Sequence, residues 1–353
     1  MPFYSLPVWV GSHKQFSNSL CEKSQIFFKM QAGLNKMKWF VAIGLIAVIV
    51  AMGCISNPQP TGQNHSMAIA TTFFPLQDLT KKIVGDTAEV FSIVPSGIEP
   101  HDYEPSPQEF VSFQNARAFI TMGLEFEHLE GEFIESRSAP ITVIHAEKGI
   151  VLLDGDEEHE HEHEEEHMEE HAHEEEHEEE HTGKDPHIWL SPKNMQVMAQ
   201  NISAGLMNAF PDNATLYEQN TQQLIANLMQ LDQEYAQGLS QCNKDIVLVS
   251  HNAFSYLAND YGFQTIHISG LEPESEPTPD QIRELVDAAK EHDLKYIFYE
   301  ELVDPRVSNA IAQEVGAQTL ELNPAEGSSN PDEDYFSIMR ENLNHLKLAL
   351  ECS

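Results

Sequence analysis

Basic residues are scarce in this 353-residue chain. It has 19 Lys and Arg against 57 Asp and Glu, which gives a formal net charge of −38 at pH 7. A protein that binds nucleic acid needs a basic surface to meet the phosphates, and adsorption to anionic lipid needs one as well. The composition therefore argues against both kinds of partner, and attachment to a membrane would have to come from a covalent lipid.

Long apolar runs are lacking too. The most apolar stretch, residues 39–53, has 15 residues, fewer than the ~20 that a membrane-spanning helix needs. It follows two lysines and is typical of the apolar part of a signal peptide, so we expect residues 1–53 to be an upstream segment and signal. Residues 51–53 precede Cys54 and resemble a lipoprotein signal in which this cysteine is lipidated. An uncleaved anchor or a plain secretory signal are the alternatives, and residues 54–67 are expected to form a tether.

Cysteine is rare, with four in the chain. Cys21 lies in the upstream segment and Cys54 is assigned to the lipid. Cys242 and Cys352 are then an even pair in an exported chain, a setting in which disulfides form and persist. A disulfide between them and two free thiols are both compatible with the sequence.

One stretch has no Lys or Arg and is very rich in acidic residues and histidine. Residues 154–181 hold 17 Asp and Glu and eight histidines. Imidazole is a common zinc ligand, and the surrounding carboxylates attract divalent cations, so this stretch could bind metal as an auxiliary site. A solvated charge run without metal is the alternative. The candidate auxiliary ligands are His159, His161, His163, His167, His171, His173, His177 and His181.

The rest of the chain alternates between strand-like and helical segments, twice. The first set of expected strands covers residues 68–74, 88–95, 118–123 and 142–149. The second set covers residues 245–251, 263–270, 295–301 and 317–324. Strands that alternate with helices predict parallel sheets, so the expected fold class is α/β with two lobes of similar architecture. The expected domains are an N-terminal lobe (68–212) with a disordered acidic His-rich loop (154–184), a linking helix (213–241) and a C-terminal lobe (242–353).

The linking helix is indicated by an apolar stripe. Residues 213–237 contain no Pro or Gly, and their apolar side chains recur at intervals of three, four and seven. Such a helix would be about 40 Å long at ~1.5 Å per residue. A stiff connector of this length couples the two lobes closely, so we do not expect a large hinge motion. The stripe consists of Tyr217, Leu224, Leu228, Leu231 and Tyr235.

Three histidines fall where ligands bind in parallel sheets, beyond the carboxyl ends of strands. His101 lies in a proline-rich loop after the second strand, His187 follows the acidic stretch, and His251 ends the first strand of the second lobe. Each alone is an ordinary histidine. Together, on loops of two facing lobes, they provide three ligands for a tetrahedral zinc site.

Five separated motifs resemble those of the metal-binding lipoproteins of zinc and manganese ABC importers. In order they are GIEPHDYEPSP, DPHIWLSP, SHNAFSYLANDYG, HISGLEPESEPTP and YEELVDPR with LNPAEG, and the likeness runs from Ala68 to the C-terminus. This resemblance implies two α/β lobes joined by a long rigid helix, with the metal in the cleft between them. It implies His101, His187 and His251 as ligands, and an ABC permease with its ATPase as partners.

Different features of the sequence indicate the metal and the fourth ligand. Manganese-type members tend to have an oxygen ligand at the third position, whereas this chain has His251, and nitrogen donors favour zinc over harder cations. The fourth ligand is often the Asp of an LDP sequence, but this chain reads LNPAEG, with Asn323 there. We expect Glu326 to be the fourth ligand, with water, Asn323 or Glu300 as alternatives. Asp185 and Asp102 are candidates to orient the imidazoles.

The predicted function is capture of zinc on the outer face of the cytoplasmic membrane and its delivery to the importer, by a lipid-anchored monomer. A manganese or iron importer component, or a surface zinc buffer or adhesin, are the alternatives. A zinc hydrolase is disfavoured because the sequence has no HExxH and no Gly-rich or nucleophile-elbow motif. We therefore expect no enzymatic activity.

Overall fold

Two four-stranded parallel sheets organise the part of the chain that the structure, a computed structural model, describes. The described residues are 67–101, 103–124, 129–155, 183–273, 275–330 and 332–353. They belong to one unit, His65–Ser353. The expected signal segment, Cys54, the tether as far as residue 66, Asp102 and the eight histidines of the acidic stretch lie outside them.

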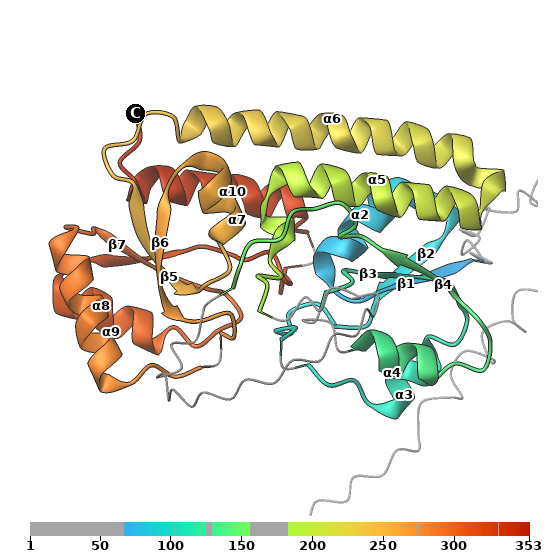
Figure 1. Cartoon of the computed structure of the whole chain (residues 1–353), viewed down its shortest axis with the longest axis horizontal. Helices are drawn as coiled ribbons and strands as arrows, with labels where there is room; N and C mark the ends of the chain where they lie inside the picture. The colour runs from blue at the N-terminus through green and yellow to red at the C-terminus, as the bar shows by residue number, and fades with distance from the viewer. Residues whose placement is uncertain (1–66, 102, 125–128, 156–182, 274, 331) are drawn as a thin grey trace, which may run out of the picture. The chain divides into compact units, whose positions relative to one another are not determined.

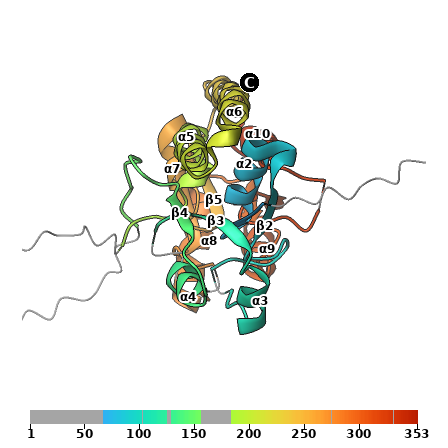
Figure 2. The ribbon, with the colours of Figure 1, turned by 90° about the vertical axis from the view of Figure 1, so that its right-hand side faces the viewer.

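The N-terminal lobe contains the first sheet, with the strand order β2-β1-β3-β4. Figure 2 shows α2 and α5 on one side of this sheet and α3 and α4 on the other. The strands are β1 Ala68–Thr71, β2 Glu89–Ser92, β3 Ala116–Thr121 and β4 Thr142–His145. The helices are α2 Phe74–Val84, α3 Pro107–Ser112, α4 Leu129–Glu135 and α5 Pro192–Ala209, with short turns η1 Gly85–Thr87, η2 Ile188–Leu190 and η3 Pro211–Asn213.

The C-terminal lobe repeats the same topology, since its strand order is β6-β5-β7-β8. Its strands are β5 Ile246–His251, β6 Gln264–Ser269, β7 Tyr296–Tyr299 and β8 Gln318–Glu321. Its helices are α7 Ser255–Tyr261, α8 Pro279–Glu291, α9 Arg306–Val315 and α10 Tyr335–Ala349. The predicted class, α/β with two similar parallel-sheet lobes, is confirmed.

All eight expected strands form, but several end earlier than the sequence predicted. The strand expected over 68–74 stops at Thr71. Phe73 is the N-cap of α2 and Pro75 lies in the first turn of that helix, where a proline is well tolerated because it has no N–H to leave unpaired. The apolar residues after Thr71 therefore continue as a buried helix face.

A 25-residue helix, α6 Ala214–Gly238, connects the two lobes. Figure 1 shows it running along α5 of the N-terminal lobe and towards the C-terminal lobe, and it also contacts α2 and α10. The five residues of the predicted apolar stripe are all buried. Within the described residues, no helix is both long and apolar enough to cross a membrane.

The main hydrophobic core is continuous from one lobe to the other. It includes Leu76 and Trp189 from the N-terminal lobe, and Phe254, Phe298 and Tyr335 from the C-terminal lobe. A second, smaller cluster lies between the C-terminal sheet and helices α8 and α9. Opening the lobes would expose the shared core to water, at about 25 cal/mol per Å² of apolar surface. This cost is the physical reason to expect a small range of hinge motion.

A disulfide bonds Cys242, which follows α6, to Cys352, which follows α10. Beside it, Lys244 N–H donates to Leu350 O at 3.0 Å and Asn243 N–H donates to Glu351 O at 3.3 Å. The bond therefore ties the end of the connecting helix to the last residues of the chain, 110 positions later.

We predict that replacing both cysteines by serine (C242S/C352S) lowers the free energy of unfolding by about 2–4 kcal/mol, because the unfolded chain regains the freedom of a long closed loop. Urea unfolding followed by circular dichroism measures this change. Reduction of the unmutated protein should give the same loss, and an unchanged unfolding midpoint would contradict the prediction.

Candidate metal centre

The three predicted histidine ligands occupy chain segments that leave the carboxyl edges of the two sheets. His101 follows β2, in a loop that turns at Gly97, whose φ of +78° suits a residue without a side chain. His187 lies directly before η2, and His251 is the last residue of β5. The structure thus brings together residues 86 and 64 positions apart in the sequence.

Four donor atoms converge between the lobes. Nε2 of His187 lies 3.3 Å from Nε2 of His101 and 3.2 Å from Nε2 of His251. Oε1 of Glu326 lies 3.5 Å from Nε2 of His101, 3.5 Å from that of His187 and 3.6 Å from that of His251. Atoms bonded to one tetrahedral zinc at about 2.0–2.1 Å are about 3.3 Å apart. These five separations match edges of such a tetrahedron, and all four donor atoms lie within 4.8 Å of one another.

Each histidine has a carboxylate at its other ring nitrogen. Nδ1 of His187 lies 2.8 Å from Oδ1 of Asp185, the role the sequence indicated for Asp185. Nδ1 of His251 lies 2.8 Å from Oε1 of Glu300. Nδ1 of His101 lies 3.4 Å from Oε2 of Glu272. A carboxylate can only accept, so Nδ1 carries the proton and Nε2 presents a lone pair to the centre.

Neutral imidazoles in these tautomers would point three lone pairs at one another, with a carboxylate oxygen beside them. Such an arrangement is repulsive unless a cation or protons lie between the atoms. His187 and His251 are fully buried and Glu326 is 2% exposed, so water screens little of this repulsion. Of the described buried polar atoms, Oε1 of Glu326 is one that makes no hydrogen bond. The donor set therefore fits a bound metal ion.

A network of amides shapes the loop that carries Glu326. Asn342, from α10, donates to Asn323 O at 2.7 Å and accepts from Asn323 N–H at 2.9 Å. The side chain of Asn323 accepts from Ala325 N–H at 2.8 Å, and Ala325 has a φ of +54°, a strained value for alanine. Trp189 Nε1 donates to Pro324 O at 2.7 Å. This loop is held in a single shape that directs Glu326 inward.

The two other protein candidates for the fourth ligand have other contacts. Asn323 shapes the loop and donates to Oε2 of Glu301 at 3.3 Å. Glu300 accepts from the main-chain N–H of His251 at 3.2 Å as well as facing its Nδ1. Among these three residues only Glu326 belongs to the group of donor atoms that lie within 4.8 Å of one another.

The charge of the site changes the acidity of its members. Burial alone lowers the pKa of His101, but its contacts with Glu272 and Glu326 outweigh burial and raise the pKa to about 9. The pKa of His251 is also raised, because Glu300 and Glu326 outweigh burial. Burial raises the pKa of Glu326, but the three imidazoles outweigh it and hold the pKa well below its usual range. Without metal, the cluster retains protons.

Two aromatic residues beside the proposed ligands, Trp189 and Tyr103, pack in or against the main hydrophobic core. Trp189 is fully buried and its ring lies edge-on to Phe73, with centroids 4.9 Å apart. Tyr103 donates its hydroxyl to Glu109 at 2.8 Å. The sequence missed the partner role of Glu272, although it lies in the motif HISGLEPESEPTP. It weighed Glu300 as a ligand and missed its role as a partner of His251.

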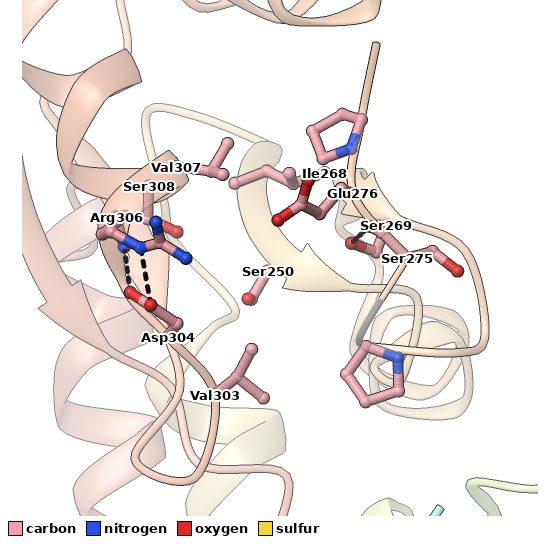
Figure 3. A pocket seen from close by; sticks show the side chains of 12 residues that line it. Ser250, Ile268, Ser269, Ser275, Glu276, Val303, Asp304, Arg306, Val307 and Ser308 are labelled. Carbon is pink, nitrogen blue, oxygen red and sulfur yellow. Dashed lines mark hydrogen bonds and ion pairs between the residues drawn. The ribbon is translucent and has the colours of Figure 1, made fainter. Parts of the chain in front are cut away.

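A separate cavity of about 100 Å³ lies in the C-terminal lobe, beside the carboxyl ends of β5 and β6 and the start of α9. Figure 3 shows Ser250 and Glu276 facing it and Arg306 paired with Asp304. None of the four donor residues lines this cavity. The metal centre is thus a cluster of packed side chains, distinct from this open space.

Two parallel-sheet lobes, a long connecting helix and a buried His₃Glu donor set between the lobes define a metal-capturing binding protein. The family model described as zinc-uptake complex component A, periplasmic, matches residues 69–349. The chain belongs to this family.

Three similar proteins illustrate the family. The high-affinity zinc uptake system protein ZnuA of Bacillus subtilis (strain 168) is 36% identical over 323 residues, which cover 89% of this chain and 98% of that protein. The zinc-binding lipoprotein AdcA of Streptococcus pneumoniae (strain ATCC BAA-255 / R6) is 34% identical over 307 residues, 86% of this chain but 59% of that protein. The crystal structure of the Zn(II)-bound ZnuA-like domain of Streptococcus pneumoniae AdcA has a TM-score of 0.66 and 32% identity, and the match covers 81% of this chain and 99% of that one.

We predict opposite pH trends for stability without metal and for zinc affinity. The pKa of His101 rises from 6.5 to about 9 on folding without metal, so its proton stabilises the metal-free fold fully below about pH 6.5. This contribution is lost as the pH rises through about 9. Zinc must displace the same protons, so its affinity should increase over the same range.

Thermal unfolding with a chelator present, from pH 6.5 to 9.5, should show a falling midpoint, whereas zinc titrations should show tighter binding. In the variant His101→Gln, the metal-free unfolding midpoint should fall less steeply with rising pH. A metal-free midpoint that is constant or rises over this range would contradict the assignment.

Proposed function

We propose that this chain captures zinc outside the cytoplasm and delivers it to an ABC permease driven by an ATPase. The observation that carries the proposal is the tetrahedral spacing of three imidazole nitrogens and one carboxylate oxygen at a buried position between two lobes. Membership in the zinc-uptake family and the zinc-related names of its relatives support this function. His101, His187, His251 and Glu326 are the proposed ligands, and zinc is the cargo.

The donor set favours zinc over manganese. Manganese and magnesium prefer oxygen donors in octahedral geometry, whereas three imidazoles with one carboxylate suit zinc. Five of the six separations between the donor atoms are 3.2–3.6 Å, close to the edge of about 3.3 Å expected for a zinc tetrahedron. The site therefore selects by both ligand type and geometry.

The same geometry favours binding over catalysis. Catalytic zinc keeps a coordination position for water, and the protein supplies three ligands. Here the carboxylate of Glu326 is the proposed fourth ligand, 3.5 Å from Nε2 of His187, and both side chains are buried. A zinc ion bound by all four donors has no corner left for a reacting water.

The amino-terminal sequence supports a proposal about where the protein is located. We propose that Cys54 carries a lipid and holds a monomer on the outer face of the cytoplasmic membrane, as the name of the pneumococcal lipoprotein suggests for that relative. A surface zinc buffer or adhesin would use the same fold and site. Zinc-limited growth that depends on both this chain and a permease separates transport from buffering.

The acidic His-rich stretch is proposed as an auxiliary zinc collector. Its eight histidines and many carboxylates can hold cations near the protein, whereas the described centre supplies a defined tetrahedron. The two therefore differ in kind: one raises the local concentration of cations, and the other selects one ion.

We predict that one tight zinc remains when all eight histidines from His159 to His181 are replaced by glutamine, because the cleft supplies four ligands of its own. In contrast, His187→Ala should weaken zinc binding at this site by more than about 100-fold. Loss of a metal ligand lowers affinity more than loss of an outer partner, a residue that only hydrogen-bonds a ligand, which lowers it about 10–100-fold. Competition with a chromophoric chelator measures both, and elemental analysis gives the stoichiometry.

His145→Gln is the matched control, because His145 pairs with Glu130 and is not among the four donor residues, so its loss should leave the tight site intact. Tight binding that vanished with the eight glutamines and ignored His187→Ala would show that the cleft is not the capture site.

A further inference from the structure

One tyrosine hydroxyl joins three chain segments that meet behind the metal centre. Tyr256 lies in α7, five residues after the end of β5, and is 4% exposed. Its hydroxyl donates to Asp185 O at 2.7 Å and accepts from Leu153 N–H at 3.0 Å. A hydroxyl can do both at once, which phenylalanine in the same place could not.

Leu153 and Asp185 belong to the two chain segments on either side of the acidic stretch, residues 153–155 and 183–185, which are called the two arms. The arms are paired, because Asp185 N–H donates to Leu153 O at 3.0 Å and Gly155 N–H donates to Gly183 O at 2.7 Å. Between these bonds Asp154 and Lys184 form an antiparallel bridge and an ion pair. Tyr256, from the C-terminal lobe, therefore holds both arms of an N-terminal-lobe segment at one point.

Asp185 connects this point to a proposed ligand. Its Oδ1 accepts from the main-chain N–H of His187 at 2.9 Å and lies 2.8 Å from Nδ1 of the same residue. Asp185 is fully buried, and its Oδ2 has no hydrogen-bond partner among the described residues. The orientation of this carboxylate thus depends on Oδ1 and on its main chain, whose carbonyl is bonded to Tyr256.

We propose that Tyr256 is a positioning residue of the metal centre, which fixes the Asp185 peptide and, through the Asp185 carboxylate, the imidazole of His187. The inference rests on the proposed role of His187 as a zinc ligand. The same tyrosine is on the helix that follows His251, so it also sets the position of the His187 segment relative to the His251 segment. The ligand atoms of a metal centre must stay within about 0.5 Å of the binding geometry.

The expected effect is on metal binding rather than on folding alone. In the full chain, Tyr256→Phe should weaken zinc binding about 10-fold, within the range of about 10–100-fold for loss of an outer partner. The matched control is Tyr235→Phe, because the buried Tyr235 hydroxyl also donates to a main-chain carbonyl, that of Met339 at 2.6 Å, but in α6 and α10. Both variants should lower the thermal unfolding midpoint, and only Tyr256→Phe should weaken zinc binding.

A spectroscopic comparison separates positioning from general destabilisation. Cobalt(II) reports ligand geometry through its visible absorption, so Co²⁺-loaded Tyr256→Phe should show an altered spectrum and Tyr235→Phe the spectrum of the unmutated protein. Equal zinc affinity and equal cobalt spectra for the two tyrosine variants would overturn the positioning role.

A double-mutant cycle tests whether the effect passes through Asp185. If it does, Tyr256→Phe should add less than a twofold loss of zinc affinity in an Asp185→Ala background. A full 10-fold loss in that background would overturn the proposed route. If His187→Ala retains tight zinc, the proposed function fails and the positioning role with it. If His187→Ala loses tight zinc but Tyr256→Phe binds normally, only the positioning role fails.

Discussion

The repulsion among four buried donor atoms is the constraint on which the rest of the structure depends. Three imidazole nitrogens and a carboxylate oxygen lie within 4.8 Å of one another, five of their six separations being 3.2–3.6 Å, within a site that excludes most water. Four surrounding carboxylates add to the negative charge: Glu99, Asp185, Glu272 and Glu300. Either protons or a divalent cation must occupy the centre. Affinity for zinc and affinity for protons are therefore two aspects of one electrostatic requirement.

Two layers of structure oppose this repulsion. The inner layer is polar and consists of the carboxylates behind the histidines and the amide network around Asn323 and Asn342. The outer layer is the apolar core shared by both lobes, which is supported by α6 and by the Cys242–Cys352 disulfide. The inner layer orients the donors, and the outer layer keeps them from separating. A flexible pair of lobes would relieve the repulsion by moving apart instead of by binding metal.

Different groups of the protein attract cations and select among them. Surplus acid throughout the chain attracts any cation, but over a range limited by salt to about 8–10 Å. Selection requires fixed donors, and these are found where the two sheets' carboxyl edges meet. The three histidines also differ in their support. The partners of His187 and His251 are buried, whereas the side chain of Glu272, beside His101, is 68% exposed.

The sequence by itself determined the fold class, the approximate places of the eight strands and the long helix, because periodicity and turn residues are local properties. Its motifs also named His101, His187 and His251 as candidate ligands, and left Glu326 as one of several candidates for the fourth. It could not determine strand ends such as Thr71, where the first turn of α2 begins. Nor could it show that Glu300 faces His251, that Glu272 faces His101, or that the Tyr256 hydroxyl meets Leu153 and Asp185. These contacts join residues up to 171 positions apart. Only packing of the two lobes brings them within hydrogen-bonding distance, and no local pattern records which distant groups will meet.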